Sequence, residues 1–278
     1  MVAAVLALAA SVAWGIGDFL GGIKSRTLAP LAVLAVAQPV GLALMLVVGL
    51  VHWEPWPGRE VLFAVPAAAL GTTGLIAFYR GMAAGAISLV APIAATGVLI
   101  PVAFGLATGE RPSALQLVGI ALAVGGAVVT SYEPGSATQR PRIAAGIGWA
   151  LLAAVAFGGY FIPMHAASED DFVWAALVFR TTSFSLVLIA VLALRPRLAR
   201  APRDLAVIAC IGIADTSGNV FFAAAASQGL VSVVSVLASL YPVVTVVLAR
   251  VYLRERVTRV QEAGAVTTLA GVALVSAG

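Results

Sequence analysis

The sequence is poor in charged residues and nearly lacks cysteine and histidine. Charged side chains make up 10% of its 278 residues, whereas they make up about a quarter of a soluble domain. The single cysteine, Cys210, excludes a disulfide within the chain, and it does not form a metal site with two widely separated histidines. No glycine-rich loop carries a phosphate-binding lysine, so ATP-driven chemistry is not indicated. We therefore expect no metal, no cofactor and no catalytic residue.

Long apolar stretches are what the sequence has in abundance. Hydrophobic residues make up 62% of the chain, and the mean hydropathy is +1.07. A helix that spans a bilayer needs about 20 mostly apolar residues. We expect about ten such helices, at residues 2–22, 31–51, 61–80, 86–107, 113–131, 143–164, 172–194, 204–227, 231–252 and 260–277. The sequence thus predicts an all-α integral membrane protein, multi-pass in the cytoplasmic membrane and surrounded by lipid.

The two halves of the chain share a sequence pattern. Thr72, Gly74, Phe78, Gly85, Ser88 and Val90 recur at a constant spacing as Thr216, Gly218, Phe222, Gly229, Ser232 and Val234. We predict a five-helix repeat at 1–131, a linker at 132–142 and a second five-helix repeat at 143–278. An odd number of spans makes the second repeat enter from the opposite face, so the repeats are expected to be inverted. Transporters with inverted repeats bind substrate near the membrane midplane.

The cations gather in every second break between the predicted spans. Only Arg59 and Arg111 lie in the even-numbered breaks, whereas the odd-numbered breaks hold nearly all the others, beginning with Lys24 and Arg26. The positive-inside rule then places the odd-numbered breaks in the cytoplasm and both termini outside. This placement also accounts for the basic pI of 9.7, so we expect no nucleic-acid partner.

Two opposite charges lie well inside predicted spans. Asp215 is roughly 16 Å into the span 204–227 at 1.5 Å per residue, and Arg180 is inside the span 172–194. Charges at such depth are costly and are usually functional. They are expected to form an ion pair, or Arg180 receives a substrate carboxylate that displaces Asp215. A fixed structural pair is the alternative. Asn219 shares a helix face with Asp215, four residues earlier.

Further polar, aromatic and proline residues are candidates of lower rank. Gln38, Trp14, Tyr160 and Tyr241 are candidates for a solute-binding cavity, with ordinary packing and interhelical hydrogen bonding as the alternative. Pro92, Pro101 and Pro242 are candidates for broken helices or hinges. Asp18, nearer the end of its span, is expected at the membrane interface with Lys24 or solvent as its partner. Glu110 and Arg111 are expected to form a turn and cap.

The end of each half resembles a known family. Gly109-Glu110-Arg111-Pro112-Ser113, followed by Gln116, Gly119 and Gly125-Gly126, resembles the close of an EamA unit, and Trp14-Gly15 fits the same pattern. The second half is similar but more diverged, with Leu253-Arg254-Glu255-Arg256 followed by Gln261, Gly264 and Gly271. The resemblance is to the EamA-type members of the drug/metabolite transporter superfamily. It implies ten helices and export of amino acids, sugars, drugs or other metabolites. The family's termini are often cytoplasmic, which is opposite to the orientation that the loop charges favour here.

The residues and the resemblance together indicate a secondary transporter, with export as the favoured direction. The expected solute is a small polar metabolite such as an amino acid. Arg180 would bind its carboxylate through two hydrogen bonds, and Asp215 would bind its amine or a proton. A multidrug or lipophilic-cation exporter is one alternative, which would need an unpaired acid and an aromatic cage. A membrane-embedded enzyme acting on a lipid diphosphate, suggested by Asp170-Asp171, is another. Protons are a candidate coupling partner, and both a monomer and a homodimer remain open.

Overall fold

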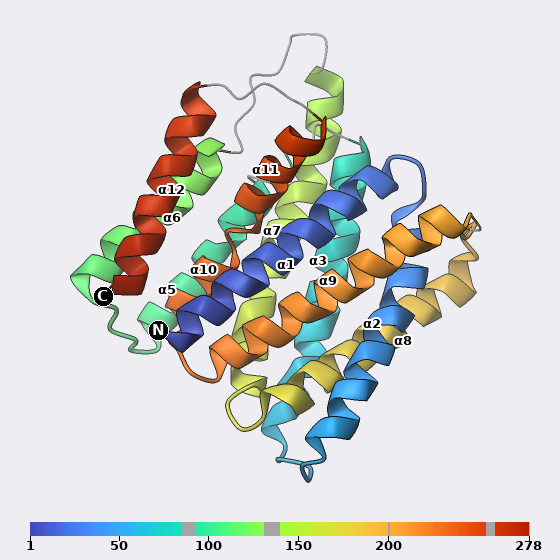
Figure 1. The fold of residues 1–278 in the computed structure, drawn as a ribbon, viewed down its shortest axis with the longest axis horizontal. Helices are drawn as coiled ribbons and strands as arrows, with labels where there is room; N and C mark the ends of the chain where they lie inside the picture. Colours follow the sequence, from blue (N-terminus) through green and yellow to red (C-terminus); the bar gives the residue numbers. More distant parts are fainter. Residues whose placement is uncertain (85–89, 91–92, 131–139, 200, 254–258, 278) are drawn as a thin grey trace.

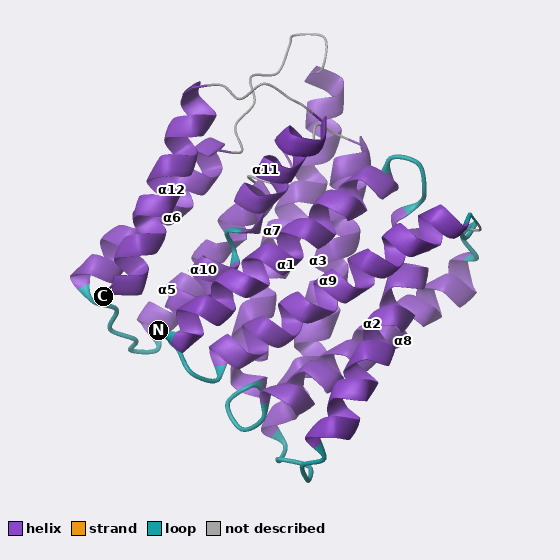
Figure 2. Cartoon of the chain, viewed as in Figure 1, coloured by secondary structure: helices purple, strands orange, loops and turns teal. Residues whose placement is uncertain are grey.

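A computed structural model describes residues 1–84, 90, 93–130, 140–199, 201–253 and 259–277. The described residues are helical apart from short connections, and they contain no strand (Figure 2). The elements are α1 (Val2–Ser25), α2 (Pro30–His52), η1 (Glu60–Phe63), α3 (Ala64–Ala84), η2 (Thr96–Val98), α5 (Leu99–Ala107), α6 (Ala114–Thr130), α7 (Arg140–Ala167), α8 (Phe172–Leu194), α9 (Pro202–Ala226), α10 (Val231–Ala238), α11 (Tyr241–Leu253) and α12 (Arg259–Ala277). Most of the predicted linker 132–142 lies outside the described residues.

Six helical segments are long and apolar enough to cross a membrane. They are Val2–Ser25, Pro30–His52, Glu60–Ala84, Gly146–Ala167, Phe172–Leu194 and Pro202–Ala226. Shorter apolar helices occupy Ile93–Ala107, Ala114–Gly126, Val231–Thr245 and Val266–Val275. Each predicted span overlaps one of these segments. The protein is therefore a multi-pass, all-helical membrane protein, and the count of ten crossings stays a prediction.

Helices of one half pack mainly against helices of the other. α1 lies along α9, α3 lies along α7, α2 lies against α8, and α6 lies against α12. The α6–α12 pair forms one flank of the molecule, and α2 and α8 lie at the opposite flank (Figure 1). Gly119 and Gly126 allow α6 to approach the α12 backbone near Gly271 and Thr268. Small residues serve this purpose in membranes, where lipid removes the hydrophobic drive for helix association.

The chain ends and the even-numbered connections lie at one end of the bundle. In Figure 1 the N- and C-termini are at the same end as the connections 108–113 and 227–230, whereas the connection 26–29 is at the other end. Glu110 joins the halves at the first end. Its carboxylate accepts hydrogen bonds from the backbone N–H groups of Val231 (2.6 Å) and Ser232 (3.1 Å), at the start of α10. The expected cap is thus confirmed for Glu110, and it stabilises a helix of the other half.

The ninth predicted span is broken in the middle. α10 ends at Ala238 and α11 begins at Tyr241, so Pro242 falls in the first turn of α11. The backbone N–H groups of a first turn have no acceptor within their own helix, so the N–H that proline lacks costs α11 no helical hydrogen bond. The first half has a comparable irregularity, because the 3-10 turn η2 precedes α5, whose first turn contains Pro101. Pro92 lies outside the described residues. Two of the three predicted proline sites thus accompany irregular helix geometry.

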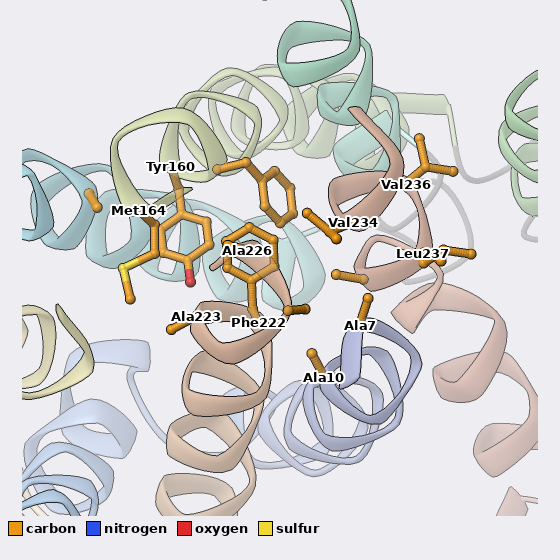
Figure 3. Close-up of a cluster of buried hydrophobic side chains, with 14 of the residues drawn as sticks. Ala7, Ala10, Tyr160, Met164, Phe222, Ala223, Ala226, Val234, Val236 and Leu237 are labelled. Carbon is orange, nitrogen blue, oxygen red and sulfur yellow. The ribbon is translucent and has the colours of Figure 1, made fainter. Parts of the chain in front are cut away.

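A cluster of buried side chains joins α1, α7, α9 and α10. Figure 3 shows Tyr160 and Met164 of α7 beside Phe222, Ala223 and Ala226 of α9, with Ala7 and Ala10 of α1 and Val234, Val236 and Leu237 of α10 around them. The alanines bring α1 close to α9 and α10, and the aromatic rings fill the remaining space. This packing fixes the position of Tyr160, which also faces the cavity described next.

Candidate solute-binding site

A cavity lies between the two halves. Its wall comes from α1, α2, α3, α7, α8, α9 and α11. The polar residues that line it are Asp18, Gln38, Thr72, Ser183, Asp215, Asn219, Tyr160 and Tyr241, and the other lining residues are Trp14, Gly71, Leu75, Phe157, Phe161 and Phe179. Of the seven residues predicted from the sequence to bind solute, all but Arg180 are part of this wall.

Arg180 lies directly behind the cavity wall. Its side chain is 1% exposed, and its Nη2 donates to Oδ2 of Asp215 at 2.9 Å. Its Nη1 donates to Oε1 of Gln38 at 2.8 Å. The expected ion pair between Arg180 and Asp215 is therefore confirmed, and Gln38 joins it from α2. Gln38 and Asp215 screen the guanidinium from the cavity, so a solute carboxylate would have to displace one of them to reach it.

Gly41 makes room for the guanidinium. It lies one turn after Gln38 on α2, and a Cβ atom there would clash with Oγ1 of Thr216 and lie 3.3 Å from Cζ of Arg180. Thr216 is itself fixed, because its hydroxyl donates to the carbonyl of Gly212 at 2.7 Å. A side chain at position 41 would therefore press on Arg180. Sequence reasoning did not single out Gly41, since its importance depends on how α2 docks on α8 and α9.

Asn219 connects Asp215 with the aromatic part of the wall. Its Nδ2 donates to the backbone carbonyl of Asp215 at 2.7 Å, one helical turn earlier. Its Oδ1 accepts a hydrogen bond from the hydroxyl of Tyr160 at 2.9 Å. Both ends of the amide are thus engaged within the protein. Asn219 positions Tyr160 across the α7–α9 interface, and its shared face with Asp215, expected from the spacing, is what allows this.

Asp18 differs from the sequence-based expectation. Lys24 forms its ion pair with Asp204 of α9 instead. Asp18 is 8% exposed and lines the cavity, and no hydrogen-bond partner for it is found in the described part of the chain. The expected interfacial pairing with Lys24 is wrong because Lys24 lies six residues further along, roughly 9 Å along the helix axis.

The aromatic residues of the wall form two connected groups. The Trp14 ring lies 6.1 Å from that of Tyr160 and 5.9 Å from that of Phe222, centroid to centroid. The Tyr241 ring lies 6.4 Å from the rings of Phe157 and Phe78. Trp14 and Tyr160 thus meet as cavity residues, and Tyr241 belongs to the second group. Pro101 and Pro242 do not appear among the described lining residues.

Thr72, Ser183 and Phe179 are lining residues that the sequence analysis did not propose. Two signals were available. Thr72 is one of the recurring anchors, paired with Thr216, and Ser183 follows Arg180 by three residues, which places both on one helix face. Phe179 had no such signal, because one more phenylalanine in an apolar span is indistinguishable from packing.

Comparisons with known proteins give a family and a solved structure of the same fold. The model of the EamA-like transporter family matches residues 1–132 and 144–277. A solved crystal structure of a protein superposes with a TM-score of 0.77 at 16% sequence identity, covering 99% of this chain and 96% of the other. At that identity the likeness shows the fold alone. A search of curated proteins gives no match.

Proposed function

The chain belongs to the EamA-like transporter family, and we propose that it is a secondary transporter that moves a small solute through the cavity by alternating access. One observation carries the proposal. The cavity lies where the two halves meet, and an ion pair that both a solute and a proton could disturb stands at its wall. Such a site between repeats is the recurring arrangement of secondary carriers. We further propose that the protein exports its solute across the cytoplasmic membrane, with protons as the coupling ion.

Matching contacts in the two halves support an inverted repeat. Gly15 of α1 abuts Val244 and the carbonyl of Tyr241, and Gly158 of α7 abuts Ile100 and the carbonyl of Gly97. The residues that contact Gly158 are the ones that correspond, in the sequence repeat, to the residues that contact Gly15. Trp14 against Gly218 and Phe157 against Gly74 form another such pair. We therefore propose ten crossings in two five-helix repeats, 1–131 and 143–278, related by an axis in the membrane plane.

The broken segments supply a route for alternating access. α11 begins with Tyr241, which lines the cavity, directly after the interruption at residues 239 and 240. A change of angle between α10 and α11 would move the Tyr241 ring relative to Phe157 of α7. Pro242 and Pro101 keep these segments from forming continuous helices, and we propose them, with Pro92, as hinges. Rocking of one repeat against the other would then open the cavity to alternate sides.

The first candidate solute is a small polar metabolite such as an amino acid. Its carboxylate would replace Asp215 on the guanidinium of Arg180, and Asp215, whose side chain is 22% exposed, would bind the amine or a proton. This exchange keeps the buried arginine paired at each stage, because a carboxylate leaves only as another arrives. Planar guanidinium groups favour such exchange, since they bind carboxylates through parallel hydrogen bonds.

The second candidate solute is an organic cation with an apolar body. The observation that favours it is the combination of Asp18, which has no hydrogen-bond partner among the described residues, with a wall rich in aromatic rings. The lipid-diphosphate enzyme is not proposed further. Oδ1 of Asp171 accepts hydrogen bonds from the N–H groups of Val173 and Trp174 at the start of α8, and Oδ2 accepts one from His52. Both oxygens of the Asp171 carboxylate therefore already have hydrogen-bond partners within the protein, and they are not free to bind a diphosphate.

Transport by the purified protein tests the proposal. Proteoliposomes would be assayed with labelled amino acids, sugars and aromatic amines, with protein-free liposomes as the blank. We expect saturable uptake of at least one amine-bearing solute, and competition between solutes that share the cavity. The matched control is a variant in which Leu75, a lining residue, is changed to Trp to fill the cavity. Uptake that this variant leaves unchanged would contradict a route through the cavity.

A further inference from the structure

We propose that Asp18 is the subsite for a protonated amine, so that the transported solute is recognised by its ammonium group at α1 and by its apolar body on the aromatic wall. This inference rests on the proposed transport function and names the solute class that the cavity fits. It shifts the cation-binding role from Asp215, where the sequence places it, to a residue that the sequence assigns to the membrane interface.

The first argument is the state of the Asp18 carboxylate. The residue is 8% exposed, and it lines the cavity. A buried carboxylate is normally paired or hydrogen-bonded, because removing it from water without compensation is costly. Lys24, the nearest cation in sequence, is engaged by Asp204. Among the described residues Asp18 has no hydrogen-bonding partner, so its charge is compensated either by a proton or by a cationic ligand arriving in the cavity.

The second argument is the charge balance of the site. Asp18 and Asp215 both line the cavity, and Gly17, the residue before Asp18, lies beside the backbone nitrogen of Asp215. Two carboxylates therefore share the region, whereas Arg180 is the one guanidinium that the described residues place there, and it is already paired with Asp215. With both acids ionised the site carries excess negative charge. A solute ammonium neutralises that excess, and a solute carboxylate increases it.

The third argument is what surrounds Asp18. Trp14 lies four residues earlier on α1, so both side chains are on one face of that helix, and both line the cavity. Tyr241 lines the cavity as well. Aromatic faces attract cations, and more strongly where water is excluded. An ammonium at Asp18 would therefore be held by a carboxylate and by neighbouring rings.

The difference between Asp18 and Asp215 follows from their partners. Asp215 already accepts a hydrogen bond from Arg180 at 2.9 Å, so binding an amine there would weaken an existing buried pair. Asp18 has no such bond to lose. We infer that Asp215 neutralises Arg180 and leaves Asp18 free for the ligand, with the phenyl-sized part of the solute against Phe157, Phe161 and Phe179.

Binding of a matched pair of probes to the purified full-length protein tests the inference. Phenethylamine carries the ammonium, and 2-phenylethanol has the same shape without the charge. Their dissociation constants would be measured by calorimetry in detergent, for the wild type and for Asp18→Asn. Asp18→Glu keeps the charge. Asp204→Asn is the matched control, since it removes a carboxylate outside the cavity wall.

The wild type should bind the amine more tightly than the alcohol, and Asp18→Asn should reduce that preference about 10- to 100-fold, which is the usual range for a hydrogen bond to a charged group. Asp18→Glu should retain most of the preference, and Asp204→Asn all of it. A wild type that does not prefer the amine would overturn the inference without the use of any variant. An unchanged preference in Asp18→Asn would do so as well. Transport of uncharged or anionic solutes by that variant would leave the proposed function standing.

Discussion

Replacing Asp215 by alanine tests whether its pair with Arg180 works in transport or only holds helices together. Asp215→Ala leaves a guanidinium that is 1% exposed, with Gln38 as its remaining hydrogen-bonded side chain among the described residues and the Phe179 ring 5.8 Å away. Breaking a buried pair costs about 3–5 kcal/mol. The Asp215 side chain is 22% exposed to the cavity, where water can reach the arginine, so we expect a smaller loss of about 2–3 kcal/mol.

A double-mutant cycle measures this coupling. The free energy of unfolding would be determined in mixed micelles for the wild type, Asp215→Ala, Arg180→Ala and the double variant. Because the double variant removes both charges, its loss should be smaller than the sum of the single losses by about 1–2 kcal/mol. Strictly additive losses would refute the reasoning, since they would mean that the two side chains do not stabilise each other.

The transport arm of the same experiment separates function from structure. Arg180→Lys should abolish transport while the protein stays folded and inserted, because an ammonium cannot reproduce the planar fork that contacts Gln38 and Asp215. The double alanine variant should not restore transport. Normal transport by the double variant would show that the pair is a dispensable structural element.

Four further predictions follow from particular contacts and charges. Gly41→Ala should lower transport and stability, by about 1–3 kcal/mol in unfolding free energy, because the added methyl group presses on Arg180. Glu110→Ala should cost about 1 kcal/mol in the same measurement through loss of the α10 cap, whereas Glu110→Gln should cost less. Reporter fusions at Gly278 should be non-cytoplasmic and fusions after Arg200 cytoplasmic, and the reverse pattern would contradict the charge argument. Solute uptake into vesicles should respond to an imposed proton gradient. Uptake that ignores the proton gradient and only follows the solute's own gradient would show facilitated diffusion in place of proton coupling.

The sequence predicted the parts of the site that depend on depth along a helix. Asp215 and Arg180 are charged residues far inside apolar segments, where charge is costly, so their pairing followed from the cost alone. The position of Asn219 on the same helix face as Asp215 followed from the helical period. The recurrence of Thr72 and Gly74 as Thr216 and Gly218 indicated two related halves before any contact was known.

Other parts of the site depend on how helices dock, and the sequence could not supply them. Asp18 was assigned to the membrane interface because its distance from the end of α1 does not show which neighbour covers it. α9 packs along α1 there, with the backbone nitrogen of Asp215 beside Gly17, and Tyr241 lines the same cavity. Arg180 was expected to face the solute, but Gln38 and Asp215 stand in front of it. Pro242 indicated a broken helix, but the sequence did not show that the interruption would fall between α10 and α11, at residues 239 and 240.

Exchange across the membrane is the most direct test of the central claim, that the cavity between the halves carries a solute by alternating access. Proteoliposomes would be loaded with unlabelled phenethylamine, and uptake of labelled phenethylamine would be compared with that into empty proteoliposomes. A carrier that must return with or without solute should show faster labelled uptake into loaded vesicles. Cavity-filling Leu75→Trp should remove that acceleration. Equal uptake into loaded and empty vesicles would contradict alternating access through this cavity.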